Sequence, residues 1–112
     1  MSARAETAAW LVQRASAAVL AICVTAHIAT VVYAVRGGLT AAEILGRTRG
    51  SAAWLAFYAL FVAAVAIHAP LGLRAILREW VGAAGRGVDL ALALFALALA
   101  AAGWRAVAAV TL

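Results

Sequence analysis

Three long apolar segments, separated by short stretches rich in glycine and arginine, dominate this sequence of 112 residues. Residues 15–35 and 50–73 contain no formal charge, and residues 90–104 are nearly all leucine and alanine. A helix needs about 20 residues to cross the hydrocarbon core of a membrane, and these segments meet or approach that length. The pattern predicts an all-α integral membrane protein, an up-down-up bundle of three transmembrane helices over about residues 10–36, 51–81 and 88–112.

Glycines and polar residues mark the predicted helix ends. Gly37-Gly38 ends the first apolar segment, as glycine commonly does after a helix. The motif Thr-Ala-Ala-Glu at residues 40–43 is a capping box, which predicts a short interfacial helix over residues 40–45 that Gly46 ends. Asp89 precedes the third apolar segment, and we expect its carboxylate to cap that helix.

The charge balance fits a membrane protein better than a nucleic-acid-binding protein. The sequence is 69% hydrophobic and has a net charge of +5, from nine basic and four acidic residues. The basic residues are all arginines at the ends of the apolar segments, the usual pattern at a membrane interface. We therefore expect membrane lipid, and no nucleic acid, around this chain. The single cysteine, Cys23, excludes an intrachain disulfide and is interpreted as a packing residue.

The stretch from Ile67 to Trp80 carries the strongest candidate chemistry. His68 stands inside an apolar segment, where a charged ring is costly, so we expect a neutral imidazole that can ligate a metal or haem iron. Gly72, one turn later, removes side-chain bulk where a large flat ligand could press against the helix. Arg74 follows at the interface, placed to meet haem propionates or an acidic partner. The alternative is a histidine that only bonds to a neighbouring helix.

A second histidine, His27, stands in the first apolar segment. Each histidine lies past the midpoint of its own span, and neighbouring spans are antiparallel, so His27 and His68 should differ in depth by about 12 Å. This offset disfavours one haem held by both histidines of the same chain. It favours two haems at different depths, each completed by another chain, unless His27 merely bonds to a neighbouring backbone carbonyl.

The predicted topology brings the start of the first span and the end of the second to the same membrane face. Donors, an acid and an aromatic side chain then gather at the edge of the hydrocarbon, a set that suits a quinone headgroup with its two carbonyl acceptors. The alternative is a charged interfacial collar without a ligand. The residues of this predicted cluster are Gln13, Arg14, Ser16, Arg74, Arg78, Glu79 and Trp80.

Residues 10–81 resemble the membrane anchors of succinate dehydrogenase and fumarate reductase. The stretch Gln-Arg-Ala-Ser-Ala at residues 13–17 is similar to the opening of the first span in that family. The pattern of His68, Gly72 and Arg74 resembles the family's haem-ligand helix. Residues 77–80, Leu-Arg-Glu-Trp, stand where the family has an Asp-Tyr pair.

The resemblance implies a cytochrome b anchor in one domain over residues 1–112, the non-flavin membrane subunit of an oxidoreductase complex. Such a subunit would hold flavoprotein and iron–sulfur subunits at the cytoplasmic face of a bacterial inner membrane, with its own N-terminus on that side. Arginines divide five to four between the two predicted faces, so the charge count does not fix this orientation. Electrons would pass between the iron–sulfur subunit and membrane quinone.

The resemblance also assigns the candidate site residues. His68 would be an axial ligand of haem b, and Arg14, Ser16, Glu79 and Trp80 would line the quinone site, with the Trp80 indole replacing the family's phenol. Gln13 stands where the family often has a histidine. His27 resembles the first-span histidine of five-helix, two-haem members, which implies one or two haems per anchor pair and a second anchor chain, identical or homologous.

Two other functions are compatible with the sequence. One is a haem-free structural or assembly protein of the membrane, in which both histidines only join helices. The other is the cytochrome b anchor of a different quinone-linked dehydrogenase, although such anchors usually have four spans and more histidines.

Overall fold

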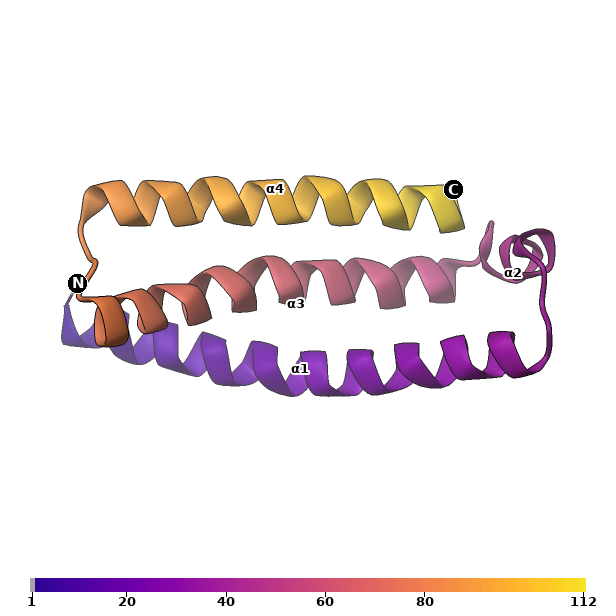
Figure 1. The fold of residues 1–112 in the computed structure, drawn as a ribbon, viewed down its shortest axis with the longest axis horizontal. Coiled ribbons are helices and arrows are strands. Elements are labelled where there is room, and N and C mark those ends of the chain that lie inside the picture. The colour runs from indigo at the N-terminus through magenta and orange to yellow at the C-terminus, as the bar shows by residue number, and fades with distance from the viewer. Residues whose placement is uncertain (1) are drawn as a thin grey trace.

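The computed structural model describes residues 2–112, which form four helices (Figure 1). Their bounds are α1 Ala3–Arg36, α2 Ala41–Thr48, α3 Ala52–Ile76 with a π-helical continuation Leu77–Val81, and α4 Arg86–Thr111. α1, α4 and α3 with its continuation are each long and apolar enough to cross a membrane. The prediction of an all-α protein with three transmembrane helices is confirmed.

Local sequence explains several helix ends. Thr40 Oγ1 accepts a hydrogen bond from the backbone N–H of Glu43 at 3.2 Å, so the predicted cap of the short helix is present. Ser51 Oγ caps α3 in the same way by accepting from the N–H of Trp54. After the π-helical turn, Gly82 has a φ of 72°, a left-handed conformation that glycine adopts without steric cost.

Two predicted helix ends are wrong, and tertiary contacts explain both. Gly46 does not end the short helix, because α2 continues to Thr48, which is buried against the end of α4. Asp89 does not cap α4, which begins after Gly85 without a side-chain cap. The Asp89 carboxylate instead accepts a hydrogen bond from Arg74 Nε at 3.1 Å, across the loop that joins α3 to α4.

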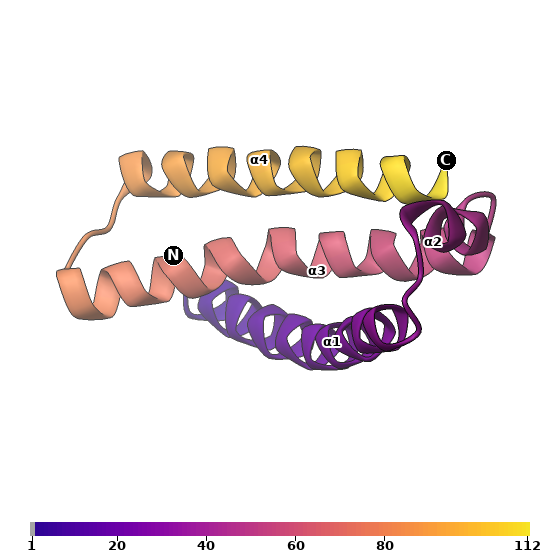
Figure 2. The same cartoon turned by 45° about the vertical axis from the view of Figure 1, so that its right-hand side comes forward.

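α3 is the central helix of the bundle. It lies between α1 and α4 and packs against both, and each neighbour runs antiparallel to it (Figure 1). Figure 2 shows α3 and α4 side by side, with α1 inclined to both and α2 folded across the end of the bundle. α1 therefore has α3 as its main neighbour in the bundle.

α3 and α4 approach closely because Gly103 has no side chain. A Cβ at Gly103 would lie 2.6 Å from Cγ1 of Val62, closer than two carbon atoms can pack. Leu92 and Val107 on α4 are buried as well. Small residues that let helix backbones approach are the usual means of packing in membranes.

Residues 48–50 hold the end of α4 through three hydrogen bonds, a group of contacts that we call the C-terminal clasp. Thr48 Oγ1 donates to the carbonyl of Val110 at 2.6 Å, and the N–H of Gly50 donates to the carbonyl of Thr111 at 2.9 Å. Arg49 Nη2 donates to the carbonyl of Ala109 at 3.5 Å. These are carbonyls of the last turn, which have no partner within their own helix.

Substituting Gly103 with alanine should destabilise the bundle. The new Cβ overlaps the β-branched side chain of Val62, which cannot rotate away freely, and overpacking of this kind costs about 1–3 kcal/mol. The free energy of unfolding, measured by denaturant titration in detergent micelles with circular dichroism, tests this. Gly87→Ala is the matched control in the same helix, because nothing lies within 4 Å of its Cβ position. Equal stability of the two variants would contradict the close packing.

Candidate functional site

Polar side chains of α1 contact α3 and its π-helical continuation from one end of the pair to the other. Each step forward along α1 is matched by a nearly equal step back along α3, so the contacts share one antiparallel register. The pairs are Glu6–Arg78, Gln13–Gly72, Ser16–His68 and His27–Tyr58.

His68 is held from α1 by Ser16. Ser16 Oγ lies 3.2 Å from His68 Nδ1, and the Ser16 hydroxyl also donates to the backbone carbonyl of Gln13 at 3.0 Å. Ser16 is buried and His68 is half-buried. The contact uses Nδ1 and leaves Nε2, the ring nitrogen that commonly ligates metals, for another partner.

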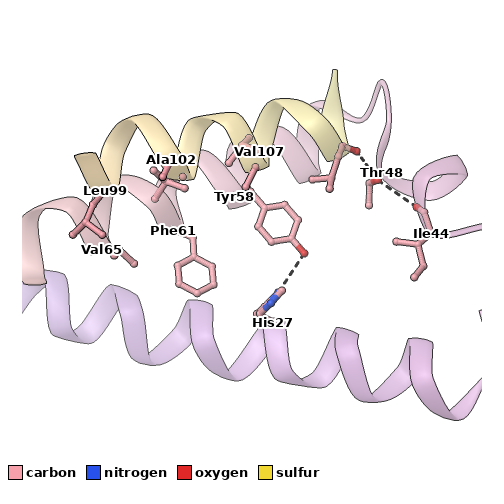
Figure 3. A pocket seen from close by; sticks show the side chains of 13 residues that line it. His27, Ile44, Thr48, Tyr58, Phe61, Val65, Leu99, Ala102 and Val107 are labelled. Atoms are coloured by element: carbon pink, nitrogen blue, oxygen red, sulfur yellow. Dashed lines mark hydrogen bonds between the residues drawn. The ribbon is translucent and has the colours of Figure 1, made fainter. Parts of the chain in front are cut away.

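His27 is held from α3 in a similar way. Its Nδ1 lies 3.3 Å from the hydroxyl of Tyr58, as Figure 3 shows. The rings of Tyr58 and Phe61 meet the imidazole edge-on, each with its centroid 5.8 Å from that of His27. The ring of His27 therefore points away from the lipid-facing side of α1, toward the other helices.

The two histidines occupy different levels of the bundle. Ser16 and His27 are eleven positions apart on α1, so the two levels are separated by about 16 Å along the helix. The sequence predicted a somewhat smaller separation, of about 12 Å. Both rings turn toward the neighbouring helix of their own chain. The structure does not bring His27 and His68 together.

The larger cavity lies at the level of His27 and has a volume of about 580 Å³. All four helices contribute to its walls, which are apolar apart from a few side chains (Figure 3). The polar side chains are His27, Tyr58 and Thr48. α4, in which the sequence shows no chemical motif, supplies Leu99, Ala102, Gly103, Ala106, Val107 and Val110. The run of small residues at 100–103 was the available signal for a hollow here.

The smaller cavity, of about 160 Å³, lies at the opposite end, between the start of α1 and the end of α3. It brings together four residues of the predicted quinone cluster, and Glu6 and Trp10, which were not predicted from the sequence, also line it. The four are Gln13, Arg74, Arg78 and Glu79.

The other members of the predicted cluster lie outside this cavity. The guanidinium of Arg14 packs over the ring of Trp10, 5.6 Å from its centroid. Trp80 is 83% exposed at the tip of the π-helical turn, and Ser16 lies deeper, against His68. Arg14 and Trp80 therefore do not line this cavity in the isolated chain.

Gln13 lines the smaller cavity and has a side-chain oxygen without a hydrogen bond. Its Oε1 is buried and has no hydrogen-bond partner in the described chain. A Cβ at Gly72 would lie 2.9 Å from Gln13 Nε2, so the Gln13 amide occupies the space in which the sequence predicts a flat ligand. A buried carbonyl oxygen without a donor costs about 1–3 kcal/mol, which makes this amide a candidate for binding a ligand.

Three residues that line the smaller cavity, Glu6, Arg74 and Arg78, take part in ion pairs. Arg78 Nη1 lies 2.8 Å from Glu6 Oε1 and joins the ends of α1 and α3. Arg74, expected to meet propionates or an acidic partner, pairs with Asp89.

At the far end of the bundle, Arg47 donates a hydrogen bond to the Tyr33 hydroxyl. This bond raises the pKa of Arg47 above its ordinary value, so the guanidinium stays charged.

Comparison with known proteins places this arrangement in a family. The family model of the succinate dehydrogenase/fumarate reductase transmembrane subunit matches residues 1–107. The chain belongs to this family. No curated protein and no solved structure matches it.

Family membership establishes the general role of the chain. It is a multi-pass membrane subunit of a succinate dehydrogenase or fumarate reductase complex, whose partners are flavoprotein and iron–sulfur subunits. Residues 2–112 contain no group of three or more His, Cys, Asp or Glu side chains that could hold a bare metal ion.

Proposed function

We propose that this subunit binds haem b and quinone and passes electrons between the iron–sulfur subunit and the quinone pool of a bacterial inner membrane. The observation that carries the proposal is His68. His68 lies within a membrane-spanning helix, and its Nδ1 contacts Ser16 while its Nε2 makes no hydrogen bond within residues 2–112. A polar cavity lies nearby, at the ends of the same two helices. In the proposed orientation this cavity and the N-terminus face the cytoplasm.

Two features of the surroundings of His68 support its proposed role as a haem ligand. Its hydrogen bond to Ser16 orients the ring, as a ligating histidine usually requires, and its surroundings are apolar helices. Bound there, haem iron would supply one-electron transfer. His68 would supply one ligand to the iron, and a second ligand would come from a second anchor chain, identical or homologous. Arg74 is partly exposed beside Asp89, and we propose that it meets a haem propionate.

His27 supports a second haem in the anchor pair. Its ring lines an apolar cavity of about 580 Å³, within the range of about 300–1,000 Å³ for ligand sites. Tyr58 holds Nδ1 as Ser16 does for His68. Because the two histidines stand on different levels, we propose two haems per anchor pair, one at each level.

The smaller cavity is the proposed quinone site. Gln13 offers an N–H donor to a quinone carbonyl and a free carbonyl oxygen to a quinol hydroxyl, so one side chain can pair with substrate and product. Arg78 and Glu79 add a donor and an acceptor on the α3 side. Arg14 and Trp80 lie outside the cavity, and we propose that they complete the site where the iron–sulfur subunit docks.

A haem-free anchor is the second candidate, and one observation favours it. Each histidine already has a hydrogen-bond partner on a neighbouring helix of the same chain, Ser16 for His68 and Tyr58 for His27. Such pairs join helices in membranes without any cofactor. The two candidates differ in the haem content of the purified complex.

His68→Ala should remove a low-spin haem b signal while the subunit still inserts and assembles. The substitution deletes an axial ligand but retains an apolar surface toward α1. Optical and electron paramagnetic resonance spectra of the purified complex provide the measurement. Unchanged spectra and haem content would refute the assignment of His68.

Gln13→Leu should lower quinone reductase activity about tenfold, the effect of removing one hydrogen bond to a buried group, and leave dye-linked succinate oxidation intact. Stability should not suffer, because Oε1 is already unpaired. Thr25→Val is the matched control, since Thr25 lies on the exposed side of α1 and bonds only to its own helix. An equal loss of both activities would point to a docking role instead.

His27→Ala should halve the haem content of a two-haem anchor pair and leave the remaining spectrum nearly unchanged. The two levels are separate, so removing one ligand should not disturb the other. Pyridine haemochrome quantitation against the number of anchor chains gives the stoichiometry. One haem per two chains, insensitive to the substitution, would exclude the second haem.

A further inference from the structure

Ser16 makes two contacts that together determine the state of His68. The resemblance to anchor subunits places Ser16 at the quinone site, but in the structure its hydroxyl lies between His68 Nδ1 and the carbonyl of Gln13. We infer that Ser16 is a positioning residue. It fixes His68 in the tautomer with the proton on Nδ1 and the lone pair on Nε2.

The assignment follows from counting protons. A backbone carbonyl can only accept, so the 3.0 Å contact between Ser16 and Gln13 uses the single proton of the Ser16 hydroxyl. Ser16 Oγ then presents a lone pair to His68 Nδ1, 3.2 Å away. Both contacts are hydrogen bonds only when Nδ1 carries the ring proton. In a neutral imidazole this leaves Nε2 with the lone pair.

Burial gives this tautomer preference its strength. Ser16 is only 7% exposed, and a hydrogen bond that breaks in an apolar environment is not replaced by one to water. With the proton on Nε2, the Ser16 hydroxyl could bond to either Nδ1 or the Gln13 carbonyl, but not to both. The bond to Gln13, on the preceding turn of α1, also limits the rotation of the Ser16 side chain, so the imidazole meets a fixed oxygen.

The pair His27–Tyr58 shows by contrast what Ser16 adds. Within residues 2–112 the Tyr58 hydroxyl has no second hydrogen-bond partner. Its proton can point toward Nδ1 of His27 or away from it, so that pair is satisfied by either tautomer. The two histidines thus have similar first partners, yet only His68 has its lone pair assigned.

The consequence for a metal ligand is direct, and this part of the inference depends on the proposed haem function. Only the nitrogen with the lone pair can coordinate iron. A hydrogen bond donated by the other ring nitrogen raises the basicity of the ligand and fixes its orientation. Ser16 therefore prepares His68 as an Nε2 ligand before any haem arrives. The tautomer itself does not depend on haem.

The tautomer can be read without a cofactor. The chain has only two histidines, so His27→Gln in the full chain leaves His68 as the single ring to observe. Nitrogen-15 magnetic resonance of histidine-labelled apo-protein in lipid nanodiscs separates the two tautomers. We expect an Nδ1–H ring with Ser16 present, a mixture or the reverse tautomer with Ser16→Ala, and restoration with Ser16→Thr, which retains a hydroxyl.

Thr25→Ala controls for removal of a hydroxyl elsewhere on α1 and should leave the His68 signal unchanged. An Nε2–H ring in the parent chain, or a signal that Ser16→Ala does not alter, would overturn the inference.

In the assembled complex, Ser16→Ala should weaken binding of haem b by about 10- to 100-fold, the usual effect of removing a partner of a metal ligand. Haem occupancy at limiting haem supply and the low-spin resonance spectrum report this, and Ser16→Thr should restore both. Full occupancy with an unchanged spectrum would overturn the role toward haem. A tautomer that responds to Ser16 in a complex that never contains haem would refute the proposed function and leave the tautomer inference standing.

Discussion

The antiparallel register of α1 and α3 is the constraint on which the rest of the structure depends. In hydrocarbon a polar side chain has no water to bond, so each such group must find its partner within the protein, on its own helix or on an adjacent one. One register satisfies Ser16 with His68 and His27 with Tyr58, and the same register places Arg78 beside Glu6. A shift of α1 by one turn would separate all of these pairs at once. The positions of both cavities follow from that register.

The spans were predictable because each depends on a local property of the chain. A run of about 20 apolar residues is sufficient to indicate a transmembrane helix, and Thr40 with Glu43 was sufficient to indicate a cap. The end of α2 was not predictable, because Thr48 stays helical through contacts with α4 that are remote in sequence. Asp89 shows the same limit: a common capping residue was drawn into an ion pair with Arg74 by the loop geometry.

For the candidate site, the sequence could indicate which residues are involved but not which residues they contact. A histidine in an apolar segment is conspicuous in any sequence, so His27 and His68 could be selected. Their partners could not, because the rotation of each helix about its axis decides which side chain faces inward. Arg14 and Gln13 are adjacent in sequence, yet one packs on Trp10 and the other lines the smaller cavity. The sequence indicated that Gly72 leaves a space on the surface of its helix. It could not indicate that Gln13 fills this space, because that depends on how α1 packs against α3.

The C-terminal clasp has a consequence for how this bundle can move. Its three bonds join the last turn of α4 to the segment that directly precedes α3, at the membrane surface where α2 lies. Sliding α4 along α3 by a single turn, about 5.4 Å, would break every one of them. The clasp therefore opposes movement of α4 along its own axis. The other end of α4 is held by a different interaction, the ion pair between Asp89 and Arg74, so the two ends of this helix are fixed to α3 and its flanking segments by polar contacts of different kinds.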